Sequence, residues 1–155
     1  MQAVLSVIRG GSLCGEKNEK KRRPDLAWCI DYGRVVVVCE VDENGGHPYE
    51  ITECELGRLW TLTDAFKKLM GEQTQVFFIR VNPDEFDGDI ISLDERVEIV
   101  SDRIQWLLEM EDDELEQFDN SIPYVGYYFY HSKCHFQIEA AKKCTESMKV
   151  MEVYP

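Results

Sequence analysis

The chain has 155 residues, of which 44% are hydrophobic, so it can bury one hydrophobic core of ordinary domain size. No apolar run approaches the roughly 20 residues that a membrane-spanning helix needs, and the first residues lack the pattern of a secretory signal. We therefore expect an intracellular protein, cytoplasmic or nuclear, with no membrane partner, whose six irregularly spaced cysteines are reduced thiols.

The net charge of −13 is concentrated in one segment, because residues 84–119 hold fifteen of the thirty acidic residues and two of the seventeen basic ones. A basic cluster near the N-terminus consists of Lys17, Lys20, Lys21, Arg22 and Arg23. Phosphate binding requires positive charge, so we expect residues 1–23 to form an N-terminal segment with a basic arm, in which Lys20, Lys21, Arg22 and Arg23 contact nucleic acid. The acidic segment is expected to point away from substrate, to cover the site, or to bind a protein partner. Residues 24–155 then form a single domain.

The first half of the chain predicts two strands, a helix and a third strand. Strands are expected over 24–31 and 35–41, because a Tyr-Gly-Arg turn separates two apolar runs. Four consecutive valines in the second run are typical of a central strand that is covered on both faces. Apolar residues at helical spacing predict a helix over 52–70 that ends at Gly71, and a third strand follows over 75–81.

The second half continues the alternation of helices and strands. A helix over 93–110 is expected to bury one face, formed by Val97, Val100, Ile104, Leu107 and Leu108. A mobile acidic linker is expected over 111–120, before a strand over 122–130. A short helix over 138–148 and a strand over 149–154 complete an α/β protein with a mixed sheet.

Two clusters in this half have both a functional and an ordinary structural interpretation. The aromatic residues of the strand over 122–130 can stack on bases, but aromatic residues routinely fill the interior of sheets, and we favour a core role. The spacing also permits a zinc site, formed by His131, Cys134, His135 and Cys144. No Cys-x-x-Cys pair accompanies it, so a packed helix surface is favoured.

Three carboxylates gather at one end of the expected hairpin. Asp25 opens the first strand and Glu40 ends the second, so the two lie at the same end of the sheet if the strands pair. Asp42 follows Glu40 by two residues and projects to the same face. Carboxylate oxygens are the ligands that Mg²⁺ and Mn²⁺ prefer, and such an ion can activate water and neutralise charge on a phosphate. Each acid taken singly is more readily explained as a solvent-facing strand end, so the prediction depends on the residues that follow.

These residues belong to an ordered set between Arg22 and Phe86. The set comprises Pro24-Asp25, Glu40-Val-Asp42, His47, Cys54-Glu55, Arg58 and Phe78-Ile-Arg80. It resembles the core of the PD-(D/E)XK, or restriction-endonuclease-like, nuclease superfamily, and within it the very-short-patch-repair-like branch. It is also similar to uncharacterised members from large DNA viruses and eukaryotic microbes. The resemblance implies a central mixed β-sheet flanked by helices, and a metal-dependent endonuclease that hydrolyses phosphodiester bonds in DNA.

The resemblance also implies roles for individual residues. Asp25 and Glu40 would bind Mg²⁺ or Mn²⁺. Asp42 stands where the superfamily usually has a lysine that orients the attacking water or steadies the phosphate. The role of that lysine would pass to His47, as a general acid or base, or to Arg58, as a phosphate contact. Alternatively, Asp42 would be a further metal ligand.

The missing lysine also favours a second hypothesis, in which the chain is a catalytically inactive interaction module with an acidic flank. A cap-snatching-type RNA endonuclease is a weaker third candidate, because it needs a histidine upstream of Asp25 and the sequence has none. We expect DNA rather than RNA as the nucleic-acid partner, and a homo-oligomer is compatible with the sequence. Arg80 is expected to pair with an acid of the site, because an unpaired charge in an apolar strand is costly.

Overall fold

The computed structural model describes residues 2–3, 24–30, 33–42, 53–84, 91–130, 138 and 148–154, and it describes only the backbone of residues 2–3 and 53–56. Its elements are β1 (Gln2–Ala3), β2 (Leu26–Ile30), β3 (Val35–Val41), α1 (Glu53–Met70), β4 (Gln75–Val81), α2 (Leu93–Leu108), α3 (Asp112–Leu115), β5 (Tyr124–Tyr128) and β6 (Lys149–Tyr154). The strands over 35–41, 75–81 and 149–154 have the predicted bounds. The other elements expected in the described ranges begin or end within a few residues of the prediction.

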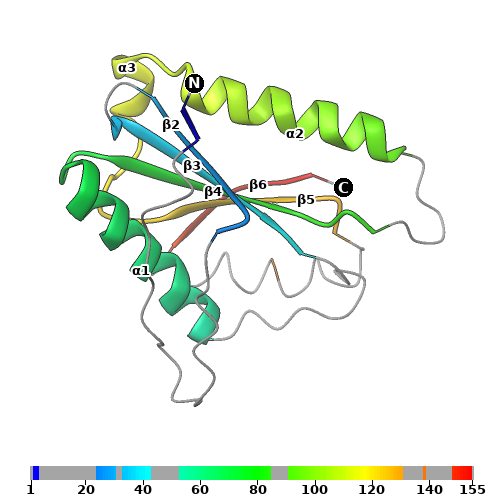
Figure 1. Cartoon of the computed structure of the whole chain (residues 1–155), viewed down its shortest axis with the longest axis horizontal. Helices are drawn as coiled ribbons and strands as arrows, with labels where there is room; N and C mark the ends of the chain where they lie inside the picture. Colours follow the sequence, from blue (N-terminus) through cyan, green and yellow to red (C-terminus); the bar gives the residue numbers. More distant parts are fainter. Residues whose placement is uncertain are drawn as a thin grey trace.

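A six-stranded mixed sheet runs through the molecule in the order β1-β2-β3-β4-β5-β6 (Figure 1). The first three strands pair in antiparallel fashion, and β3 to β6 pair in parallel. Parallel neighbours need a long crossover, which α1 provides between β3 and β4, and α2 with α3 between β4 and β5. Figure 1 shows α1 on one face of the sheet and α2 on the other. The predicted α/β class, with a mixed sheet flanked by helices, is confirmed.

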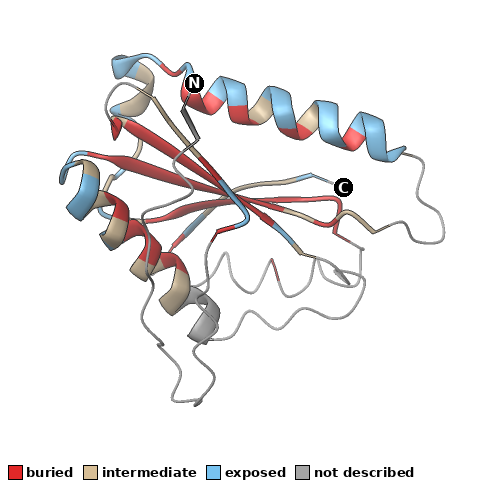
Figure 2. Ribbon diagram, in the orientation of Figure 1, coloured by how far each residue is buried: buried red, intermediate tan, exposed pale blue. Residues whose placement is uncertain are grey.

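The valine run of β3 lies at the centre of the fold, with both faces covered (Figure 2). Val36 and Val38 pack in the core on the α1 face, together with Leu59, Leu62 and Phe66 of α1. Val35 and Val37 pack in the core on the opposite face, beneath α2. Side chains that alternate along a strand explain why one run of valines serves two cores.

The face of α2 is predicted correctly except at its N-terminal end. Val100, Ile104, Leu107 and Leu108 are buried, but Val97 is 58% exposed. The prediction for Val97 is wrong because this turn of α2 lies over an open groove rather than over packed core. Helical spacing shows which residues share a face, but it does not show where along the helix the covering strands end.

The segment 111–120 is not the mobile linker that its acidity predicts. It contains α3, and both Leu115 and Phe118 pack against the core on the α2 face. The ring of Phe118 meets the rings of Phe77 and Tyr124 edge-on, with centroids 5.1 Å and 5.0 Å apart. Two apolar anchors among many acids are enough to fix the segment on the sheet.

The aromatic strand β5 forms part of the core, as predicted. All residues from Tyr124 to Tyr130 are buried. Of the helix expected over 138–148, Ile138 and Met148 are described, and both are buried in the core on the α1 face. Within the described residues, no helix is sufficiently long and apolar to cross a membrane.

Candidate functional site

Charged side chains meet at the carboxyl ends of β3 and β4, on the face of the sheet that α1 covers. Glu40 follows Val36 and Val38 in the alternation of β3, so it projects to this face. Arg80 lies directly opposite Glu40 in the parallel pairing of β3 with β4. Both residues are buried, Glu40 at 5% and Arg80 at 2% exposure, so each requires partners of opposite charge.

Glu40 finds its partner on α1. Nη2 of Arg58 donates a hydrogen bond to Oε1 of Glu40 at 2.7 Å. Burial raises the pKa of Glu40 above its usual range, the neighbouring charge of Arg58 opposes this rise, and the carboxylate of Asp25 adds to it. The structure therefore brings Arg58 to the carboxylate site, as the sequence predicted.

Arg80 is held by Asp42, the residue that follows β3. Nε and Nη2 of Arg80 donate to Oδ2 and Oδ1 of Asp42 at 2.8 Å and 2.7 Å, which is a bidentate pair. The hydroxyl of Tyr130 also donates to Oδ2 of Asp42. The prediction that Arg80 pairs with an acid of the site is confirmed. Because both oxygens of Asp42 accept hydrogen bonds from protein groups, Asp42 has a structural role here, and its role as a metal ligand stays a prediction.

Asp25 lies beside Glu40, as the expected hairpin requires. β2 and β3 pair in antiparallel fashion with Leu26 opposite Cys39, which places Asp25 next to the end of β3. Asp25 is exposed, and its Oδ2 accepts a hydrogen bond from the backbone N–H of Val41 at 2.8 Å. The prediction that Asp25 and Glu40 share one end of the sheet is confirmed.

The carboxylates at this end of the sheet provide only some of the ligands that a hard cation such as Mg²⁺ needs. Among the described residues, no three side chains of His, Cys, Asp or Glu form a group that could hold a metal ion. Asp25 and Glu40 nevertheless each keep one carboxylate oxygen that bonds to no described residue, Oδ1 and Oε2 respectively. These two oxygens are of the type that Mg²⁺ and Mn²⁺ prefer, and both ions commonly complete their shells with water.

Tyr130 is a site residue that the strand pattern alone does not identify. A strand over 122–130 would put Tyr130 on the same face as Tyr128, which packs under α2. Instead β5 ends at Tyr128, and Phe129 adopts a positive φ of 62°, which turns Tyr130 back to the α1 face. Phenylalanine rarely adopts this backbone conformation, so the sequence contains no signal for it.

Asn82 explains how this turn is held. Its side-chain amide donates to the carbonyl oxygen of Phe129 at 3.0 Å, and its Oδ1 accepts from the N–H of Asp84 at 3.1 Å. This contact between Asn82, which follows β4, and the end of β5 joins residues 47 positions apart and was missed from the sequence. Asn82 thus fixes the position from which Tyr130 reaches Asp42.

Several predicted site residues lie outside the described residues. These are His47, the basic residues Lys20, Lys21, Arg22 and Arg23, the side chain of Glu55, and His131, Cys134, His135 and Cys144. Comparisons with protein-family models, with curated proteins and with solved structures find no match to this chain.

Proposed function

We propose that the chain is a Mg²⁺- or Mn²⁺-dependent endonuclease that hydrolyses phosphodiester bonds in DNA and has a restriction-endonuclease-like core. The main support is the meeting of Asp25, Glu40 and Arg58 at one end of the sheet, from three different elements. The succession of β1, β2 and β3, then α1, then a parallel β4 also agrees with the fold that the resemblance implies.

Asp25 and Glu40 would hold the ion through the oxygens that bond to no described residue. The bound metal would supply an activated water molecule and neutralise charge on the phosphate. Because Glu40 is buried, few water molecules would compete with a bound cation for its carboxylate.

Arg58 is suited to contact the phosphate. Its side chain is only 18% exposed and its guanidinium already bonds to Glu40, so a phosphate bound beside Glu40 would be within reach of the same donors. Asp42, Arg80 and Tyr130 would position the end of β3 and take no part in proton transfer. His47 remains the proposed general acid or base, and residues 20–23 remain the proposed contacts to the DNA backbone.

The second candidate is a catalytically inactive interaction module. It is favoured by the pairing of both acids at the end of β3 with arginines, Glu40 with Arg58 and Asp42 with Arg80. Each acid therefore has a cationic partner within the protein, which is what a structural site needs, and no lysine stands in the position of Asp42.

A cleavage assay distinguishes the two candidates. Double-stranded DNA and RNA of equal length would be incubated with Mn²⁺ and the parent chain, Asp25→Asn or Glu40→Gln, with Asp64→Asn on α1 as a control of equal charge change. We expect DNA cleavage that each site variant lowers by about two orders of magnitude and the control leaves unchanged, because one metal ligand is lost. Cleavage that persists in both site variants would exclude this metal site, and a folded parent without cleavage would favour the module.

A further inference from the structure

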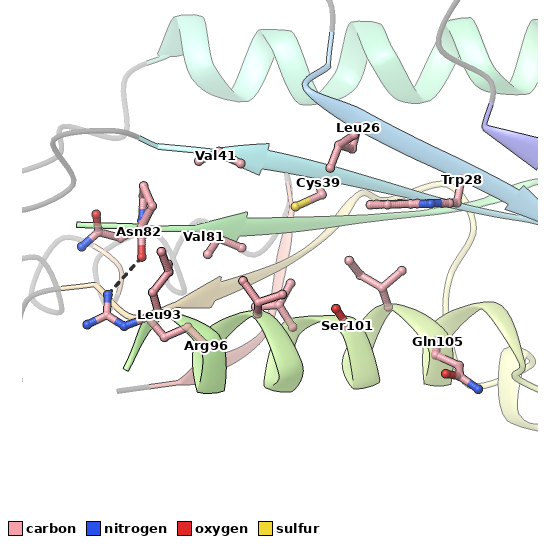
Figure 3. Close-up of a pocket in the computed structure, with 14 residues that line it drawn as sticks. Leu26, Trp28, Cys39, Val41, Val81, Asn82, Leu93, Arg96, Ser101 and Gln105 are labelled. Carbon is pink, nitrogen blue, oxygen red and sulfur yellow. Dashed lines mark hydrogen bonds between the residues drawn. The ribbon is translucent and has the colours of Figure 1, made fainter. Parts of the chain in front are cut away.

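A groove with a volume of about 510 Å³ lies between α2 and the strands β2, β3 and β4 (Figure 3). Figure 3 shows Leu26, Cys39 and Val81 of the strands facing Leu93 and Ser101 of α2 across the groove. Cys39 alternates with Glu40 along β3, so the groove lies on the opposite face of the sheet from the carboxylate site. Any function of the groove is therefore separate from the proposed nuclease function.

Both walls of the groove expose large apolar side chains. Leu93 and Val97 on α2 are 50% and 58% exposed, and Leu26 and Val41 on the strands are 41% and 40% exposed. Single exposed apolar residues are common on protein surfaces, but four that line one groove form a continuous patch. The groove extends along α2 from Leu93 to Gln105, which is about 18 Å at the rise of an α-helix.

An acidic row borders this patch. Asp94, Glu98 and Asp102 are all exposed, and each follows by one position a residue of α2 that lines the groove. Successive residues of a helix lie about 100° apart, so the acids form the neighbouring row along the helix. None of the three forms an ion pair with another described residue.

The two arginines of α2 do not neutralise this row. Arg96 is buried and donates to backbone carbonyl oxygens, those of Ile91, Asn82 and Asp84. Arg103 pairs with Glu152 at 2.9 Å and lies over the ring of Trp106 at 4.0 Å. The surface beside the groove therefore carries negative charge that the rest of the described chain does not balance.

We propose that this groove binds a segment of a partner protein whose apolar side chains are flanked by lysine or arginine. The apolar patch would take the partner's hydrophobic side chains, and the acidic row would attract its basic ones. A small apolar molecule would gain nothing from the acidic row. A second copy of this chain, docked groove to groove, would bring two acidic rows together and repel.

The test uses a fluorescent peptide of about 14 residues, with leucines on one face of a helix and lysines on the other, together with a counterpart that has glutamate for lysine. Binding to the full chain is measured by fluorescence anisotropy. The apolar variant is Leu93→Ser/Val97→Ser, with Leu69→Ser on α1 as its control. The charge variant is Glu98→Gln/Asp102→Asn, with Asp64→Asn/Glu72→Gln as a control of equal charge change.

We expect the lysine peptide to bind the parent, and each groove variant to raise the Kd by about tenfold while its control changes the Kd by less than about twofold. We also expect the glutamate peptide not to bind. Equal weakening by groove and control variants, or equal binding of both peptides, would overturn the proposal. So would a lack of lysine-peptide binding, or self-association in sedimentation that the Leu93→Ser/Val97→Ser variant abolishes.

Discussion

Arg80 is only 2% exposed, and residues from two other parts of the chain form the contacts around its guanidinium. Asp42, at the end of β3, supplies the counter-charge, and Tyr130, from beyond β5, bonds to the same carboxylate. An isolated buried guanidinium would be costly, so the three residues act as one structural unit. The acid that replaces the expected lysine is thus part of the framework of the site.

Asp42→Asn should therefore destabilise the protein more than the loss of a single hydrogen bond does. The amide cannot neutralise Arg80, and we expect the free energy of unfolding to fall by about 3 kcal/mol. Tyr130→Phe removes only the hydroxyl and should cost about 1 kcal/mol. Urea denaturation measures both variants. Equal losses would show that the charge of Asp42 is not what stabilises Arg80.

The raised pKa of Glu40 predicts how the stability of the fold changes with pH. Desolvation raises this pKa above the ordinary value of 4.5, so the folded chain still holds the proton at pH values where the unfolded chain has released it. Proton binding by Glu40 therefore stabilises the folded chain. This contribution is complete below the pKa of Glu40 in the unfolded chain, and it is lost as the pH rises through the pKa of Glu40 in the folded chain. Glu40→Gln cannot ionise and should not show this loss.

The measurement is urea denaturation of the parent and of Glu40→Gln between pH 4 and pH 7. We expect the variant to gain stability relative to the parent as the pH rises from about 4.5. A difference that stays constant over this range would show that Glu40 titrates normally in the folded chain.

Two glycines with positive φ lie next to the end of α1, one in the β2–β3 turn and one directly after the helix. Gly33 has a φ of +93°, and a Cβ added there would lie 2.4 Å from Cβ of Met70, the last residue of α1. Gly71 has a φ of +130°, and an added Cβ would meet no described atom within 4 Å. The first glycine is thus required both by its backbone conformation and by close packing, and the second by its backbone alone.

Alanine substitutions should separate the two requirements. Gly71→Ala should cost about 1–3 kcal/mol, the usual cost of a strained backbone conformation. Gly33→Ala should cost more, because the methyl group must also displace the end of α1. Thermal denaturation of the two variants tests this order, and a smaller loss for Gly33→Ala would contradict the packing at this turn.

The sequence predicts best the elements whose burial follows from a pattern among neighbouring residues. The valine run predicts β3 and its central place, and the periodicity of the helix over 93–110 predicts most of its buried face. Segment 111–120 was mispredicted because Leu115 and Phe118 are outnumbered by acids. Their anchoring depends on Phe77 and Tyr124, which lie elsewhere in the chain.

The candidate site divides in the same way. The positions of Asp25 and Glu40 at one end of the sheet follow from strand pairing and could be predicted. The turn of Tyr130 toward Asp42 depends on the positive φ of Phe129 and on its contact with Asn82, and neither feature is local to the sequence.

In the whole molecule, the sheet separates the carboxylate site on one side from the apolar groove on the other. Glu40 and Arg58 lie on the α1 side of the sheet, and the acidic row and the apolar groove lie on the α2 side. A net charge of −13 therefore does not describe either face. If the two proposals hold, nucleic acid would approach the α1 side, because the sheet separates that side from the acidic residues of α2. A basic protein segment would approach the α2 side.

The proposed nuclease function requires that Asp25 and Glu40 together hold a divalent cation, which calorimetric titration of the folded chain with Mn²⁺ at pH 7 can detect. We expect one saturable site in the parent, at least about tenfold weaker binding in both Asp25→Asn and Glu40→Gln, and unchanged binding in Asp64→Asn. A parent that shows no saturable binding, or binding that either site variant leaves intact, would exclude a metal site formed by these two carboxylates.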